Sequence, residues 1–262
     1  MPEDLQPLYT QDGNIPTSDF YIDDTMGGRG SHYVYDEPAF SHFVNFGQNL
    51  RKLSRVGKIL RGKHGLGKVA VALDAVEDKI KGGKVIVYGS MRPSFEGLAL
   101  AYGASQVVTV EHNNLTYIHP KVCTVRVRDF ELEAEREDEM ELFDIGMSIS
   151  SFDHSGLGRY GDPLEPDGDL RAMDEARKRM ASDGIFILTV PIGKDHVAWN
   201  LHRRYGALRL PRLLAGWEVI DVIGWNEGGE EWEGTGIGDS YEPVFVLKPN
   251  KHLQCEPGSE EL

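Results

Sequence analysis

A short polar loop contains the residues best suited to catalysis. Residues 150–163 carry carboxylate, imidazole, guanidinium and phenol side chains among three glycines. Histidine has a pKa near neutrality and can take a proton from an attacking hydroxyl group. We therefore predict that His154 is a general base and that Asp153 or Asp162 orients its ring. Arg159 is expected to hold a substrate oxygen, although a glycine-rich structural loop with internally satisfied polar groups is an alternative interpretation.

A second cluster of aromatic and hydrogen-bonding residues follows at 191–206. Such side chains suit a polyol such as a sugar, because rings stack on its apolar face and polar groups contact its hydroxyls. The predicted substrate-binding residues are Tyr160, His196, Trp199, Asn200, His202, Arg203 and Tyr205. The competing interpretation is a helix that Trp199 and Tyr205 pack against the sheet, with the arginines in solvent.

The turn at Gly89 comes directly after a short apolar segment and leads into a predicted helix. Glycine allows a sharp turn and close approach of a ligand, and the free N–H groups of a helix start favour a carboxylate. The methionine part of S-adenosylmethionine (SAM) carries one. Glu111 ends the next apolar segment about 20 residues later, where an acidic side chain can accept both ribose hydroxyls. The predicted cofactor-binding residues are Gly89, Ser90, Met91, Glu111, Asp129, Phe130 and Ser150, with Asp129 near the adenine and Phe130 packed on its ring.

The glycine fingerprint of dinucleotide-binding proteins, G-x-G-x-x-G, is absent after Gly89. This absence counts against NAD, whose pyrophosphate must lie close to the backbone. SAM has no pyrophosphate and does not impose that demand. A divalent metal held by Asp153, His154 or Asp162 is conceivable, but their spacing matches no ligand motif and no metal is predicted.

Alternating strand and helix patterns surround these residues. We expect helices over 39–60, 66–80, 93–102, 167–180 and 197–214, and a solvated helix or loop over 131–141. The expected strands are 84–88, 106–110, 122–127, 143–149, 185–190, 217–223 and 242–247. This alternation predicts an α/β fold with a mostly parallel sheet covered on both faces. The last two strands are joined by a loop over 226–239 and not by a helix, so we expect an antiparallel C-terminal hairpin. A seven-stranded, mostly parallel sheet closed in this way is the Rossmann-like sandwich of class I methyltransferases.

Several segments also resemble a known family. Residues 152–169, residues 199–206, Leu210-Pro211 and Gly216-Trp217 are similar to a poorly characterised family of class I SAM-dependent methyltransferase-like domains that share an HSGLGRYGDPL-type loop. The resemblance covers roughly residues 82–225. It implies the methyltransferase fold and suggests a link to glycan modification, without supplying a catalytic mechanism.

The chain divides into three parts by composition. Residues 1–38 form an N-terminal arm, with a lid role as a hypothesis, that Tyr21, Tyr33, Tyr35 and Phe40 could anchor. Residues 39–249 form the methyltransferase domain, with a helical lead-in over 39–81 and a Rossmann core over 82–249. The polar tail, 250–262, is expected to be disordered.

The overall charge restricts the partners. With 42 acidic and 28 basic residues the formal net charge is −14, which disfavours sequence-independent binding to nucleic acid. A basic stretch over 51–68 runs against this trend and could either contact an anionic partner or be a solvated helix face. The sequence contains no apolar run long enough to span a membrane and no signal-peptide pattern. Cys123 and Cys255 make neither a disulfide framework nor a metal cluster, so we expect a cytoplasmic protein or a soluble lumenal domain of a larger one.

These features favour a SAM-dependent O-methyltransferase that acts on a hydroxyl group of a sugar, glycan or similar small polyol. One alternative is an oxidoreductase or epimerase that depends on NAD or a nucleotide sugar. Another is a methyltransferase-like domain that binds without catalysing. The acceptor, its methylated position and the oligomeric state stay open at this level.

Overall fold

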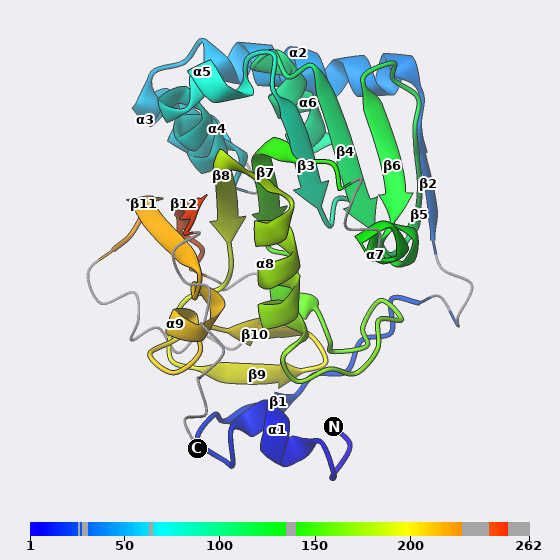
Figure 1. The fold of residues 1–262 in the computed structure, drawn as a ribbon, viewed down its shortest axis with the longest axis vertical. Helices are drawn as coiled ribbons and strands as arrows, with labels where there is room; N and C mark the ends of the chain where they lie inside the picture. Colours follow the sequence, from blue (N-terminus) through cyan, green and yellow to red (C-terminus); the bar gives the residue numbers. More distant parts are fainter. Residues whose placement is uncertain (26, 28–30, 63–64, 135–139, 227–240, 251–262) are drawn as a thin grey trace, which may run out of the picture.

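The computed structural model describes residues 1–25, 27, 31–62, 65–134, 140–226 and 241–250. Its centre is a seven-stranded sheet with the order β11-β12-β8-β7-β3-β4-β6 (Figure 1). The strands are β3 (Lys84–Tyr88), β4 (Gln106–Glu111), β6 (Val122–Arg126), β7 (Phe143–Ile149), β8 (Met180–Thr189), β11 (Trp217–Ile223) and β12 (Val244–Pro249).

The direction of the strands confirms the predicted architecture. Strands β6, β4, β3, β7 and β8 pair in parallel, whereas β12 is antiparallel to both of its neighbours, β8 and β11. The sheet is therefore closed by the expected antiparallel hairpin, as in the class I methyltransferase fold. Chain order reverses between β3 and β7, and ligands of open α/β sheets bind beside the carboxyl ends of such a pair.

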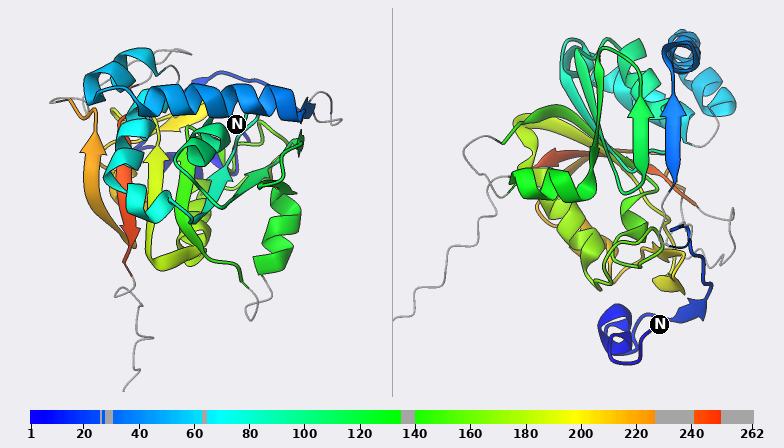
Figure 2. Two further views of the ribbon diagram at one scale, coloured as in Figure 1. Left: turned by 90° about the horizontal axis from the view of Figure 1, so that it is seen from above. Right: turned by 90° about the vertical axis from the view of Figure 1, so that its right-hand side faces the viewer.

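Helices cover both faces of this sheet. On one face lie α2 (Glu37–Arg51), α4 (Leu66–Ala75), α5 (Glu77–Ile80) and α6 (Ser94–Ala101). On the other lie α7 (Val127–Ala134), α8 (Gly168–Lys178) and α9 (Leu210–Leu213). Helix α2 runs along the outer side of the first layer (Figure 2). No helix among the described residues is long and apolar enough to cross a membrane.

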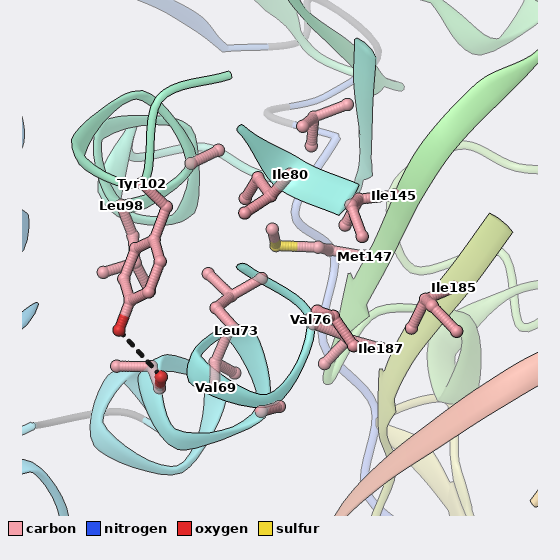
Figure 3. Packing of buried hydrophobic residues seen from close by; sticks show 14 of the residues in the cluster. Val69, Leu73, Val76, Ile80, Leu98, Tyr102, Ile145, Met147, Ile185 and Ile187 are labelled. Carbon is pink, nitrogen blue, oxygen red and sulfur yellow. Dashed lines mark hydrogen bonds between the residues drawn. The ribbon is translucent and has the colours of Figure 1, made fainter. Parts of the chain in front are cut away.

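The two faces of the sheet bury separate apolar clusters, because successive side chains of a strand point to opposite faces. Val85 and Val87 of β3 join the cluster under α4 and α6, while Ile86 and Tyr88 join the cluster under α8. Figure 3 shows the first cluster, in which the Tyr102 hydroxyl donates to the carbonyl oxygen of Ala70 at 2.8 Å. Burial on both faces explains why these strands read as continuous apolar runs.

The helical lead-in is more broken than predicted. The segment expected as one helix over 39–60 forms α2 and a separate helix, α3 (Arg55–Arg61). Ser54 interrupts it, because its side chain accepts a hydrogen bond from the Gly57 amide at 3.2 Å and caps a new helix. The segment expected over 66–80 is similarly divided into α4 and α5 at Val76.

The helix predicted over 197–214 is wrong for most of its length. The chain there forms an antiparallel pair, β9 (His196–Trp199) and β10 (His202–Arg204), before the short helix α9. Strand β1 (Thr17–Asp19) of the N-terminal arm adds to β9 in parallel and completes a three-stranded sheet. This pairing joins residues 180 positions apart, such as Thr17 and Val197, so no local periodicity could indicate it.

The N-terminal arm is anchored to the body. It contains α1 (Gln6–Thr10), β1 and β2 (His32–Tyr35), which pairs in parallel with β5 (Asn114–Tyr117). Tyr35 and Phe40, two of the predicted aromatic anchors, contact Tyr117. Tyr21 is exposed, whereas Tyr9, an anchor that the sequence analysis missed, is buried against Trp199. The predicted disordered tail falls, apart from residue 250, outside the described residues, as do residues 135–139 of the acidic stretch and most of loop 226–239.

Candidate active site

A cavity of about 690 Å³ opens beside the carboxyl ends of the central strands. Its walls come from the strand ends of β3 and β4, from loop 150–168, and from α7 and α8. The cavity therefore lies at the topological switch point between β3 and β7, and its volume is in the range of small-molecule sites.

Two predicted cofactor residues form one wall of the cavity. Gly89 has a φ of 70°, and a Cβ atom there would lie 1.9 Å from the Ser151 hydroxyl oxygen. Only glycine fits this turn, which brings the backbone up to the cavity. Glu111 is buried, and its Oε1 atom accepts hydrogen bonds from the Asn113 backbone and side-chain amides at 3.1 and 3.2 Å. Its carboxylate is thus fixed at the cavity wall.

The other predicted cofactor residues divide into two groups. Met91, Phe130 and Ser150 line the cavity, and Phe130 is held by the Arg179 guanidinium, 4.2 Å from its ring centroid. Ser90 does not line it, because its side chain turns back to donate to the Arg92 carbonyl oxygen at 3.0 Å. Asp129 is exposed on α7 and lies outside the cavity wall.

His154 also lines the cavity. Its Nδ1 atom lies 2.5 Å from the carbonyl oxygen of Leu201, and its Nε2 atom lies 3.5 Å from Oδ2 of Asp153. Burial, and then the nearby Arg159 charge, lowers the pKa of His154 to about 4. The ring is therefore neutral at pH 7, with one nitrogen fixed by the backbone.

Asp153 is fully buried beside this histidine. Neither of its carboxylate oxygens has a hydrogen-bond partner within the described part of the chain. Burial raises the pKa of Asp153 to about 6, although His202, Arg203 and Arg159 oppose the rise. The sequence analysis predicted that either Asp153 or Asp162 meets the ring, and the structure places Asp153 there.

Asp162 shapes the loop. Its Oδ2 atom accepts from the amides of Gly156 and Gly158 at 2.8 and 3.1 Å, and its Oδ1 atom accepts from Tyr160 at 3.2 Å. Both oxygens are thus occupied by the backbone of its own loop, although the residue lines the cavity. Here the alternative interpretation, an internally satisfied structural loop, describes the contacts better.

Arg159 points away from the cavity toward the N-terminal arm. Its Nε atom donates to Oδ2 of Asp24 at 2.7 Å, and its own carbonyl oxygen accepts from the Asp24 amide at 3.0 Å. The side chain expected to hold a substrate oxygen instead fixes the arm to the candidate catalytic loop.

Of the predicted substrate-binding residues, Tyr160 lines the cavity and the cluster at 191–206 does not. The expectation that this cluster faces the cleft came from the predicted helix, and β9 and β10 turn these side chains toward the arm and the loop. His196 Nε2 lies 2.8 Å from the Ser18 hydroxyl, and Asn200 accepts from the Ile22 amide at 2.7 Å. Trp199 packs edge-on to Tyr9 with ring centroids 5.1 Å apart.

The remaining members of the cluster at 191–206 pack against loop 150–168. His202 stacks on His154 with ring centroids 6.4 Å apart. Arg203 donates to the carbonyl oxygens of Ser155, Pro166 and Glu165 at 2.6, 3.1 and 3.3 Å. Tyr205 is buried and donates to Asp169 at 2.9 Å. These residues hold the loop in place without reaching the cavity.

Helix α8 contributes polar residues that the sequence analysis missed. Arg171, Glu175 and Arg179, the residue that caps the helix at its C-terminus, line the cavity and are spaced four residues apart, so they share one side. Arg171 pairs with Glu165 at 2.8 Å and with Glu131 at 3.0 Å, which ties the loop to α7 and α8 across the cavity wall. The spacing was visible in the sequence, but which face of the helix met the cavity was not. No group of three or more acidic, histidine or cysteine side chains within the described ranges is placed to hold a metal ion.

The fold and the position of the cavity define a class I methyltransferase-like α/β domain. Residues 82–231 match the model of the DUF268 family, described as a Caenorhabditis protein of unknown function. The chain belongs to this family. The matched region contains the Gly89 turn, Glu111 and the whole candidate loop. Comparison with curated proteins gave no match.

Solved structures resemble the chain at low identity. A 1,6-didemethyltoxoflavin-N1-methyltransferase of Burkholderia thailandensis, with bound S-adenosylhomocysteine, has 14% identity and a TM-score of 0.48 over 89% of this chain and 93% of its own. A candidate hemolysin of Streptococcus thermophilus has 15% identity and a TM-score of 0.45 over 70% of this chain. A SAM-dependent methyltransferase of Mesorhizobium loti has 12% identity and a TM-score of 0.40 over 69% of this chain and 97% of its own. The chain spans 65% of the length of the Streptococcus protein.

Proposed function

We propose that this protein is a SAM-dependent methyltransferase. The observation that carries the proposal is the meeting of Gly89 and Glu111 in one cavity at the switch point of the sheet. A tight glycine turn suits the methionine part of the cofactor, and a buried carboxylate suits its ribose hydroxyls. When bound, SAM supplies an electrophilic methyl group on a sulfonium centre.

The residues present fit this cofactor. Glu111 presents a carboxylate whose orientation is already fixed by Asn113. Phe130 offers an apolar ring face to the same cavity, and Met91 adds a flexible apolar contact. Ser90 and Asp129, predicted as cofactor contacts, would act at most indirectly, because their side chains lie outside the cavity wall.

The acceptor in this proposal is a hydroxylated small molecule, with a sugar or glycan as the leading class. His154 takes the hydroxyl proton on Nε2, since Nδ1 is occupied by the Leu201 carbonyl. The Asp153 carboxylate stabilises the imidazolium that forms. Tyr160, Glu165 and Arg171 supply hydrogen-bonding groups for further hydroxyls along the wall. The proposal of a polyol acceptor therefore depends on these three residues and no longer on the cluster at 191–206.

Calorimetric titration with S-adenosylhomocysteine, with NAD as the control ligand, tests the proposal. We expect micromolar binding of S-adenosylhomocysteine alone, weakened at least ~10-fold in Glu111→Ala. The matched control is Glu218→Ala, which removes an exposed glutamate from β11 and should leave affinity unchanged. If Glu111→Ala binds S-adenosylhomocysteine as tightly as the parent protein, this carboxylate does not contribute to the cofactor site.

Two other outcomes would favour other classes. Tight NAD binding without S-adenosylhomocysteine binding would favour an oxidoreductase or epimerase. Binding of S-adenosylhomocysteine without methyl transfer to any sugar or polyol acceptor would favour a binding domain that has kept the cofactor.

A further inference from the structure

Helix α3 is oriented with its apolar side chains outward. Val56, Ile59 and Leu60 are 65%, 44% and 79% exposed, although they lie at the i, i+3, i+4 spacing that normally faces a core. Lys58 of the same helix is only 3% exposed and forms an ion pair with Asp74 of α4. The usual distribution of apolar and charged residues is therefore inverted.

Close backbone packing fixes this orientation. A Cβ atom on Gly67 would lie 2.0 Å from the Lys58 carbonyl oxygen, and one on Gly62 would lie 2.0 Å from the Gly67 amide nitrogen. The two glycines let α3 rest directly on the start of α4. Rotation of α3 to bury Leu60 would lose both this contact and the partner of the buried Lys58 charge.

Positive charge surrounds the exposed apolar side chains. Lys52, Arg55 and Arg61 are exposed, and none of them has an acidic partner within the described part of the chain. No Asp or Glu occurs from residue 51 to residue 73, in a chain whose formal net charge is −14. We call this surface, made of Lys52, Arg55, Val56, Ile59, Leu60 and Arg61, the α3 patch.

We propose that the α3 patch is a peripheral docking surface for an anionic lipid membrane. Apolar side chains at the tip of a helix can enter the interfacial region of a bilayer while surrounding lysines and arginines attract acidic headgroups. A second copy of the chain is disfavoured as a symmetric partner, because two α3 patches would bring like charges together. Nucleic acid would use the cations but would leave Val56 and Leu60 without a role.

The position of α3 is compatible with such docking. Figure 1 shows α3 beside α4, in the helical layer on one face of the sheet, whereas α7 and α8, which line the cavity, lie on the other face. The docked protein would keep its cavity open to the aqueous phase, so a hydroxylated acceptor could enter while the patch is covered.

Flotation with lipid vesicles tests the proposal independently of the cofactor and of any activity. We expect binding to phosphatidylcholine vesicles that contain about 30 mol % phosphatidylserine, and no binding to pure phosphatidylcholine. The Val56→Ser, Ile59→Ser, Leu60→Ser triple variant should bind at least ~10-fold more weakly. Arg55→Gln and Arg61→Gln should each weaken binding roughly fivefold.

The matched control replaces exposed apolar residues elsewhere. Val219 and Ile220 of β11 are 44% and 51% exposed and flanked by acidic residues, and their replacement by serine should not change vesicle binding. Circular dichroism would verify that each variant is folded. Absence of binding to the acidic vesicles, or equal binding by the triple variant, would overturn the proposal. A dimer in analytical ultracentrifugation that the triple variant abolishes would identify a second copy as the occupant instead.

Discussion

His154 and Asp153 form a buried pair in which only one arrangement of the histidine proton fits. The Leu201 carbonyl, 2.5 Å from Nδ1, can only accept a hydrogen bond, so Nδ1 must carry the ring proton. Nε2 is then the basic nitrogen, and it lies 3.5 Å from Oδ2 of Asp153. A proton that arrives on Nε2 is therefore received next to a carboxylate that has no other partner within the described structure. This relationship allows a neutral histidine to act as a base in a buried site.

Replacement of His154 by alanine should reduce turnover by ~10²–10⁴-fold, because the acceptor hydroxyl would lose its base. The affinity for S-adenosylhomocysteine should stay nearly unchanged, since the proposed cofactor contacts are made by Gly89 and Glu111 and not by His154. Single-turnover kinetics together with calorimetry would measure both quantities. His32→Ala, at an exposed position on β2, is the control. Full activity of His154→Ala would exclude this histidine from the mechanism.

The pH dependence of turnover should follow the ionisation of the Asp153 carboxyl group. Its pKa is raised to about 6 by burial, whereas that of His154 is lowered to about 4. Activity should therefore rise as the pH passes about 6 and the carboxylate ionises. The Asp153→Asn variant should have lower activity. The fall of its activity at acidic pH should shift toward pH 4, where His154 becomes protonated. If the acidic fall of activity stays at the same pH in this variant, a different group must cause it.

The same variant should be more stable than the parent protein at pH 8. A carboxyl group whose pKa is raised on folding stabilises the native state below its unfolded value and loses that contribution as the pH rises through the folded value. For Asp153 the window runs from 3.8 to about 6. Above this window, the Asp153→Asn variant should gain up to about 3 kcal/mol of unfolding free energy, and this gain should vanish below about pH 4. Urea denaturation at the two pH values would measure it.

Alanine at Gly89 should damage the candidate cofactor site through a steric clash. The positive φ of 70° disfavours any residue with a Cβ atom, and the added Cβ would lie 1.9 Å from the Ser151 hydroxyl oxygen. We expect affinity for S-adenosylhomocysteine to fall at least ~10-fold as the turn moves away from the cavity. Gly82 is the matched control, because its φ is 80° but nothing lies within 4 Å of an added Cβ. Gly82→Ala should cost about 1 kcal/mol of stability and leave the affinity unchanged.

Lysine at Arg203 should loosen the candidate catalytic loop. The guanidinium group donates hydrogen bonds to four loop carbonyls, a set that a single ammonium group cannot reproduce. We expect a loss of about 3 kcal/mol of unfolding free energy, together with lower turnover. Arg212→Lys is the control: its pair with Asp167 is half-exposed, and the change should cost less than about 1 kcal/mol. Equal melting temperatures for the two variants would contradict the role given to Arg203.

The sequence by itself determined the central sheet and the two residues that end strands at the candidate cofactor site. Buried parallel strands such as Val85–Val87 have an apolar signature, and the missing helix before β12 indicates the closing hairpin. Gly89 and Glu111 could be predicted because each ends a strand of this sheet, and parallel strands present their carboxyl ends at one edge.

Tertiary structure alone decided which polar residues face the cavity. Trp199 and Arg203 have the composition of a sugar site, yet pairing of β9 with β1, far away in the chain, turns them toward the arm and the loop. Asp153 and Asp162 were equivalent candidates in the sequence, and only the fold of the loop distinguishes them, since backbone amides occupy both oxygens of Asp162. Local patterns report periodicity and burial, whereas the direction of a side chain depends on long-range contacts that no sequence window contains.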